Sequence, residues 1–352
     1  MSRIRILVVE DSLTVRMRLL EVLNADPTVE VVGDTPDGRK AVAMCQQLRP
    51  DVVSLDMVLP GLSGLQVTEE IMAHCPTPIV IVSASLNRGE IFNTFDALRA
   101  GAVDVLEKPT LDENDANWSQ QLLSTIKMAA RIRVITHVRP RSRTITPAPV
   151  VPPCTWKPAD VPRLVAIGAS TGGPAAVMTI LQQLPAGFSL PIVLLLHISD
   201  AFGPSFIEWL NSVSPFRVTS AREGDPLPDP DVARVIMAPP GRHLVVRQGA
   251  FHLTNTVERH SCRPSIDTLF ESLAAELGSN TIACLLTGMG RDGAVGLRAI
   301  RQAGGLTIAQ NAATSVVFGM PGAAIELQAA QLILPLGEIA PVLAEFATQG
   351  GY

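Results

Sequence analysis

The feature that most restricts the fold of this chain is a repeated alternation between short apolar runs and segments of helix length. The apolar runs of the first part are IRILVV, VEVVG, DVVSLD, PIVIVSA and AVDVLEKP, and those of the second part are RLVAIG, PIVLLLH, ARVIMAPP, TIACLLTG, GLTIAQ and AQLILPL. Apolar runs that alternate with helical segments predict parallel sheets with helices on both faces. The stretch RHLVVRQGAFHLTN has a Gln-Gly-Ala turn between two alternating runs, which predicts a β-hairpin in the second part.

A segment of different composition separates the two parts. Residues 138–163 read VRPRSRTITPAPVVPPCTWKPADVPR and contain seven prolines and no glycine. Proline fixes its own φ and restricts the residue before it, so this segment is predicted to be an extended, semi-rigid linker. An irregular surface loop inside one domain is the alternative, but structureless loops of this length are uncommon in compact domains.

The predicted fold class is therefore α/β, with two doubly wound parallel-sheet domains. We expect a flavodoxin-like domain over residues 1–125, a helical end and Pro-rich linker over residues 126–162, and a Rossmann-like domain with a β-hairpin over residues 163–348. In such sheets, ligands bind beyond the carboxyl ends of the strands. The residues at those ends are therefore the first candidates for function.

Composition and charge argue against several classes of protein. The 352 residues carry a formal net charge of −5, which gives no basic footprint for a nucleic acid. The 5 cysteines form no C-x-x-C pair, which argues against a disulfide scaffold or a structural zinc site and fits a reducing compartment. The N-terminus lacks the pattern of a signal peptide, and the longest apolar runs are too short to span a bilayer. We expect a cytoplasmic monomer that does not insert into the membrane.

Charged and hydroxyl side chains follow the strands of the first part. Glu10 and Asp11 follow the first run, Asp56 the third, Ser83 the fourth and Lys108 the fifth. Three clustered carboxylates repel one another unless a cation joins them, and oxygen ligands that leave room for water suit Mg²⁺. A carboxylate beside Mg²⁺ and a lysine can act as a nucleophile toward a phosphoryl group. The alternative is that these side chains are merely solvated turn residues. That alternative accounts for any one of them, but it accounts poorly for all five at successive strand ends.

The motifs VVEDS, DVVSLDMVLPGLSGL, IVSAS and LEKP resemble those of response-regulator receiver domains. The resemblance implies that Asp56 accepts a phosphoryl group from a histidine kinase, and that Glu10, Asp11 and Asp56 hold Mg²⁺ for this reaction. It also implies that Ser83 and Lys108 sense the phosphoryl group.

The second part opens with a glycine-rich turn, GASTGG, at residues 168–173. The turn fits G-x-S-x-G, in which a serine, here Ser170, stands exposed on a sharp turn between a strand and a helix. Glycines also allow backbone N–H groups to face an anion, so the turn alone leaves a phosphate-binding loop open. His197 follows the next apolar strand, where it could take the proton of Ser170 or simply cap the strand.

A second glycine-rich turn, LLTGMGRDGAVG, contains a match to the dinucleotide-binding pattern G-x-G-x-x-G. That pattern requires an acid about twenty residues further on. Gln310 and Asn311 stand in that region instead, so we interpret the match as fortuitous. The same turn places Asp292 near a helix start, where its carboxylate could accept a hydrogen bond from His197 and fix the tautomer of the ring.

The motifs GASTGGP, LLLH, APPGRHL, RPSIDTLFESLA, LLTGMGRDGAVGL and TIAQNAATSVVFGMPGAA resemble the catalytic domain of the chemotaxis protein-glutamate methylesterases of the CheB type. The resemblance implies a triad of Ser170, His197 and Asp292, with the backbone N–H of Met289 as oxyanion donor and no cofactor for the esterase. The implied activity is hydrolysis of glutamate γ-methyl esters on methyl-accepting chemoreceptors, with deamidation of receptor glutamines as a related activity. The implied regulation is a receiver domain that covers the catalytic cleft until it is phosphorylated.

Two other functions remain as alternatives at this point. A receiver fused to a nucleotide-binding sensory module would explain the glycine-rich turns but would leave His197 unused. A DNA-binding response regulator is disfavoured, because the second part is too large and too rich in strands for a helix-turn-helix module and the net charge is acidic.

Overall fold

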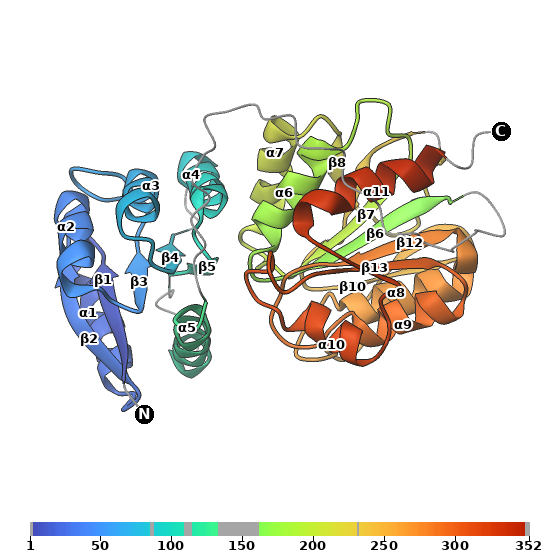
Figure 1. Ribbon diagram of the computed structural model, residues 1–352. Helices are drawn as coiled ribbons and strands as arrows, with labels where there is room; N and C mark the ends of the chain where they lie inside the picture. The colour runs from blue at the N-terminus through green and yellow to red at the C-terminus, as the bar shows by residue number, and fades with distance from the viewer. Residues whose placement is uncertain (1–2, 85–87, 109–114, 133–161, 231, 349–352) are drawn as a thin grey trace. The chain divides into compact units, whose positions relative to one another are not determined.

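The computed structural model describes residues 3–84, 88–108, 115–132, 162–230 and 232–348. The described elements fall into two compact units, one on each side of the predicted linker (Figure 1). Most of that linker lies outside the described residues, so its extended form stays a prediction.

The first unit is built on one parallel sheet of five strands in the order β2-β1-β3-β4-β5. This is the strand order of flavodoxin-like sheets, and the prediction of five parallel strands is confirmed. Helix α1 contacts α5, whereas α2, α3 and α4 contact one another in succession, so the helices form two layers. The strands are β1 (Ile4–Val9), β2 (Val29–Thr35), β3 (Val52–Leu55), β4 (Ile79–Ser83) and β5 (Asp104–Glu107), and the helices are α1 (Leu13–Asn24), α2 (Gly38–Leu48), α3 (Gly64–His74), α4 (Arg88–Ala100) and α5 (Asp115–Ala129).

Local sequence signals set the ends of these elements. Ser12 caps α1 through its side chain, Asp37 caps α2, and Ser63 forms a capping box with Gln66 at the start of α3. Such caps satisfy the first N–H groups of a helix and fix where it begins. Only residues 10–12 join β1 to α1 and residues 36–37 join β2 to α2, so these two connections are short and lie at the carboxyl edge of the sheet.

The second unit is built on a parallel sheet of seven strands in the order β14-β13-β12-β6-β7-β9-β8. Six of these strands match the predicted apolar runs. The seventh, β8, was not predicted, because its residues, VTS, include a single apolar residue and form no apolar run. The strands are β6 (Leu164–Ala169), β7 (Ile192–Leu196), β8 (Val218–Ser220), β9 (Val235–Met237), β12 (Thr281–Leu285), β13 (Leu306–Gln310) and β14 (Leu332–Leu334).

The predicted hairpin is confirmed as an antiparallel pair, β10 (His243–Arg247) and β11 (Ala250–Thr254). Arg247 faces Ala250 across the turn, and the two residues between them, Gln248 and Gly249, have φ values of 49° and 72°. Positive φ at both central positions is the mark of a two-residue turn whose twist matches that of the strands.

Helices cover both faces of the second sheet (Figure 1). Helices α6 and α11 contact each other on one face, and α8, α9 and α10 contact one another in succession on the other. Within the described residues, no helix combines the length and the apolar character that a membrane span requires. These helices are α6 (Gly173–Gln183), α7 (Gly203–Val213), α8 (Ile266–Glu276), α9 (Ala294–Gln302), α10 (Met320–Glu326) and α11 (Leu336–Thr348).

The centre of the second sheet positions its functional residues. Strand β6 lies between β12 and β7, and every residue of these three strands is buried. The sheet is parallel, so the loops that follow these three strands meet at the same edge.

Candidate functional site

The carboxyl edge of the first sheet brings together four of its five predicted residues. One oxygen atom each from Glu10, Asp11 and Asp56 lies within 4.8 Å of the other two. The Nζ atom of Lys108 lies 2.9 Å from a carboxylate oxygen of Glu10 and 2.9 Å from one of Asp56. The edge therefore holds three carboxylates and one ammonium.

One ammonium does not neutralise this cluster. Burial raises the pKa of Glu10 to about 7, the charge of Asp56 adds to the effect, and Lys108 opposes it. Burial also raises the pKa of Asp56, against the lowering effect of Lys108. Oε2 of Glu10 is buried and has no hydrogen-bond partner among the described residues. A divalent cation beside it would stabilise the ionised carboxylates, and carboxylate oxygens are ligands that Mg²⁺ prefers, so the residues present fit this ion.

Ser83 lies at the same edge but is not hydrogen-bonded to the acids. Its buried hydroxyl donates to the carbonyl oxygen of Ala84 at 3.4 Å. Among the described residues it makes no hydrogen bond to Asp56. Its predicted role in sensing a phosphoryl group therefore stays a prediction.

In the second unit, Ser170 stands on the turn between β6 and α6, and the two glycine-rich turns pack against each other there. Gly172 has a φ of 75°, and a Cβ added to it would lie 2.6 Å from Val316. A Cβ added to Gly288 would lie 2.7 Å from the Cβ of Ser170. The N–H of Ser170 also donates to the carbonyl oxygen of Thr287 at 3.0 Å. The glycines therefore allow close packing around a serine, which favours a nucleophile turn over a phosphate loop.

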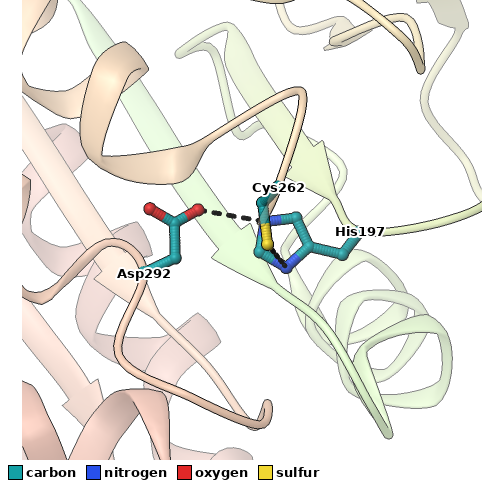
Figure 2. Close-up of side chains that lie close together, drawn as sticks. All are labelled: His197, Cys262 and Asp292. Carbon is teal, nitrogen blue, oxygen red and sulfur yellow. Dashed lines mark hydrogen bonds and ion pairs between the residues drawn. The ribbon is translucent and has the colours of Figure 1, made fainter. Parts of the chain in front are cut away.

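His197 lies beside this turn because β6 and β7 are paired up to their ends. Ala169 is paired with Leu196, and the N–H of His197 donates to the carbonyl oxygen of Ala169 at 3.1 Å. Asp292 lies on the other side, in the loop between β12 and α9. Nε2 of His197 is 3.1 Å from Oδ2 of Asp292 (Figure 2). The three predicted triad residues thus follow three neighbouring strands.

The N-terminus of α8 holds the buried carboxylate of Asp292. Oδ1 accepts hydrogen bonds from the hydroxyl of Ser265 at 2.7 Å and from the N–H of Asp267 at 3.1 Å, and Oδ2 accepts one from the N–H of Ile266 at 2.7 Å. Burial alone would raise the pKa of Asp292, but the hydrogen bonds from His197, Ser265 and the helix lower it. Since the start of a helix carries partial positive charge, this arrangement keeps Asp292 ionised.

The two ring nitrogens of His197 have different partners. Nε2 faces Asp292, and Nδ1 lies 3.8 Å from Sγ of Cys262 (Figure 2). Burial opposes protonation of the ring, but the hydrogen bond to Asp292 and the contact with Cys262 outweigh it and raise the pKa of His197 to about 9. Because Nε2 shares its proton with Asp292, Nδ1 is the nitrogen available for proton transfer.

A second serine and histidine near Asp292 have a structural role. The buried hydroxyl of Ser265 donates to Asp292 and also accepts the N–H of Thr268, which makes Ser265 the N-cap of α8. His243 accepts the backbone N–H of Ser265 at 3.1 Å, not its hydroxyl, and its other nitrogen bonds the carbonyl oxygen of Val257. Ser265 therefore has neither an accessible hydroxyl nor an imidazole hydrogen-bonded to that hydroxyl.

Comparison with known proteins finds relatives for both units. The model of the CheB methylesterase family matches residues 165–343, and that of the response regulator receiver domain matches residues 6–116. A protein-glutamate methylesterase/protein-glutamine glutaminase of Myxococcus xanthus is 40% identical over 354 residues, which cover 99% of this chain and 98% of the relative. The chain belongs to the CheB methylesterase family.

Two further similar proteins are a second relative and a solved structure. A protein of the same description from Anaeromyxobacter dehalogenans is 41% identical over 342 residues, which cover 97% of this chain and 96% of the relative. The crystal structure of the Thermotoga maritima CheB methylesterase catalytic domain is 36% identical, covers 52% of this chain and 98% of that chain, and has a TM-score of 0.49.

Within this CheB-family site, the structure joins His197 to Asp292 but does not join Ser170 to His197. Among the described residues, the hydroxyl of Ser170 makes no hydrogen bond to the ring. Catalytic hydrogen bonds are often long before substrate binds. The backbone N–H of Met289 also donates no hydrogen bond to another described residue, so it is available to an incoming oxyanion.

Sequence reasoning missed Cys262 and the role of Ser265. A serine before an apolar helical run is an N-cap signal, so the start of α8 could have been predicted. That this helix start meets Asp292 depends on tertiary packing. Cys262 lies in an irregular segment without periodicity, and no local signal places its thiol beside His197.

Proposed function

We propose that this protein hydrolyses glutamate γ-methyl esters on methyl-accepting chemoreceptors, releasing methanol, and deamidates receptor glutamines by the same acyl chemistry. The observation that carries the proposal is the pair formed by His197 and Asp292, 3.1 Å apart beside the serine turn. Membership of the CheB family and the printed activities of the relatives support the same assignment.

In the proposed acylation step, the Oγ atom of Ser170 attacks the ester carbonyl carbon. Nδ1 of His197 accepts the hydroxyl proton, since Nε2 is held by Asp292. The carbonyl oxygen becomes an oxyanion that the N–H of Met289 stabilises, an effect typically of about 3 kcal/mol per donor. The bond between the former carbonyl carbon and the methoxy oxygen then breaks, and the Nδ1 proton passes to that oxygen, so the leaving group departs as methanol.

In the proposed deacylation step, Nδ1 of His197 accepts a proton from water, and the oxygen of that water attacks the acyl-serine. The bond to Ser170 breaks, the serine recovers its proton, and a glutamate carboxylate is released. A glutamine side chain follows the same path, with ammonia in the place of methanol.

For the first unit, we propose that Asp56 accepts a phosphoryl group from the chemotaxis histidine kinase. Glu10, Asp11 and Asp56 would hold Mg²⁺, which when bound neutralises charge on the phosphoryl oxygens. Lys108 already contacts Asp56 and would bind the phosphorylated side chain, and Ser83 would sense the phosphoryl group from the end of β4.

We assign the receiver domain to residues 1–125, the linker to residues 126–162 and the esterase domain to residues 163–348, in a monomeric cytoplasmic protein. Phosphorylation of the receiver is proposed to release an inhibited state of the esterase domain. A shift of a few kcal/mol between the two states is enough to change activity by orders of magnitude.

The test is methanol release from a methylated receptor, measured with and without a small phosphodonor. Ser170→Ala should abolish methanol release and leave phosphorylation of Asp56 intact. The matched control is Ser212→Ala on α7, whose hydroxyl bonds the carbonyl oxygen of Trp209 in its own helix. Full activity of Ser170→Ala would overturn the assignment, and tight binding of NAD or ATP would favour the nucleotide-sensing alternative.

A further inference from the structure

A thiol, an imidazole and a carboxylate converge at the candidate active site, and the proposed ester hydrolysis uses only two of them. One atom each from Cys262, His197 and Asp292 lies within 4.8 Å of the other two (Figure 2). Asp292 is buried, whereas Cys262 and His197 keep partial exposure, so the cluster can be reached from solvent. The thiol has no step in the esterase chemistry.

We propose that this cluster binds a thiophilic divalent cation of the Zn²⁺ class, and that the bound ion blocks the esterase. The blocking effect rests on the proposed function, but the binding of the ion does not. Thiolate sulfur, imidazole nitrogen and carboxylate oxygen are all zinc ligands, and three protein ligands leave a fourth position for water.

The separations of the ligand atoms are near those of a zinc site, and one side chain moves toward the ion when it binds. Zinc–nitrogen and zinc–sulfur bonds of about 2.0 Å and 2.3 Å place the two ligand atoms of a tetrahedral site about 3.5 Å apart. Sγ of Cys262 lies 3.8 Å from Nδ1 of His197, and Oδ2 of Asp292 lies 3.1 Å from Nε2. These two contacts involve different ring nitrogens. An ion that joins all three side chains therefore binds one of the nitrogens, and the side chain beside the other nitrogen moves toward the ion.

A tight turn holds the thiol at this place. The backbones of Arg259 and Cys262 exchange two hydrogen bonds of 3.2 Å and 2.9 Å, and His260 and Ser261 between them have φ values of 54° and 57°. The guanidinium of Arg259 binds both carboxylate oxygens of Glu271 on α8. Two successive non-glycine residues with positive φ persist only where surrounding contacts hold them. The position of the thiol is therefore built into the fold.

A neighbouring group of possible ligands is less suited to a cation. His260, Asp267 and Asp292 also offer atoms within 4.8 Å of one another. Asp267 lies 3.5 Å from the guanidinium of Arg259. The arginine would repel a cation at this point, and the group has no sulfur ligand, so a thiophilic ion prefers the cluster with Cys262.

An ion bound at His197 removes the base from the proposed reaction. A neutral imidazole that ligates through one nitrogen carries its proton on the other. The ring then has no lone pair for the proton of Ser170, whichever nitrogen binds. Since thiol and imidazole ligands bind a metal in their deprotonated forms, affinity should rise with pH.

The experiment is a titration of the full-length protein with Co²⁺ in saturating Mg²⁺, which occupies sites made of oxygen ligands. A tetrahedral cobalt–thiolate site gives intense near-ultraviolet absorption and visible bands that octahedral oxygen sites lack. The wild type is expected to bind one ion at such a site. Cys262→Ala should lose the thiolate absorption and bind at least about tenfold more weakly. Cys75→Ser, at a part-exposed cysteine of the first unit, is the matched control and should behave as the wild type.

A second measurement tests the blocking effect. Zn²⁺ should inhibit methanol release by the wild type and by Cys75→Ser, and each variant is compared with its own zinc-free rate. Cys262→Ala should need about tenfold more Zn²⁺ for the same fractional inhibition. A wild type without thiolate absorption, or equal Co²⁺ binding by Cys262→Ala, would overturn the metal site. Since Co²⁺ binding is read without substrate, a failure of the esterase assignment would leave this result unaffected.

Discussion

Raising the pH from 7 to 9 is expected to increase kcat/KM for methanol release about 50-fold. The perturbed group is His197, which must be neutral to accept the proton of Ser170. Burial lowers the pKa of His197, but the hydrogen bond to Asp292 and the contact with Cys262 outweigh it and place that pKa at about 9.

The magnitude follows from the fraction of neutral imidazole. With a pKa of about 9, that fraction is about 1% at pH 7 and about one half at pH 9. The value of kcat/KM reports the free enzyme, whose geometry is the one described here. The activity should therefore rise nearly tenfold per pH unit below pH 8 and level off above pH 9.

The assay follows methanol release from methylated receptor at substrate concentrations well below KM, at constant ionic strength and constant phosphodonor. Esters also hydrolyse without an enzyme in alkali, so the rate with Ser170→Ala is subtracted at every pH. Asp292→Asn serves as the companion variant. It removes the charge that raises the pKa of His197, so its residual activity should level off at a lower pH than that of the wild type.

A profile for the wild type that is flat between pH 7 and 9, or that levels off near pH 6.5, would refute this reasoning. It would mean that the imidazole is already neutral at pH 7, and that Asp292 orients the ring without stabilising its charged form.

Three further predictions concern other parts of the structure. Ser265→Ala removes a hydrogen bond to the carboxylate of Asp292 and the cap of α8, so the free energy of unfolding in urea should fall by about 2 kcal/mol; an unchanged value would show that water replaces the hydroxyl. Gly288→Ala places a methyl group 2.7 Å from the Cβ of the candidate nucleophile and should lower kcat at least about tenfold, whereas Gly337→Ala, with no atom within 4 Å of the added group, should leave kcat unchanged. Burial raises the pKa of Glu10 from 4.5 to about 7, so the folded receiver holds this proton more tightly than the unfolded chain. Without Mg²⁺, the free energy of unfolding should therefore fall by about 3 kcal/mol as the pH rises from 4.5 to about 7. Glu10→Gln should flatten this dependence on pH, and added Mg²⁺ should oppose the loss of stability. A dependence on pH that survives the substitution would mean that another group causes it.

The strands and the residues that follow them could be predicted because their signals are local. An apolar run bounded by turn residues identifies a strand wherever it packs, and Ser170 and His197 follow such runs directly. The exception, β8, reads VTS, so no apolar run marks it, and its pairing with β9 places it at the edge of the sheet.

The sequence by itself determined the two parallel-sheet units, the residues at the strand ends and, through its motifs, the resemblance to receivers and CheB esterases. Only the tertiary structure decided what surrounds those residues. Asp292 stays charged because hydrogen bonds from His197 and from the start of α8 lower its pKa against the effect of burial. Cys262 faces His197 because a turn anchored to Glu271 places it there. Contacts of this kind join segments far apart in sequence and leave no periodic pattern in either segment, so they become visible only when the chain is folded.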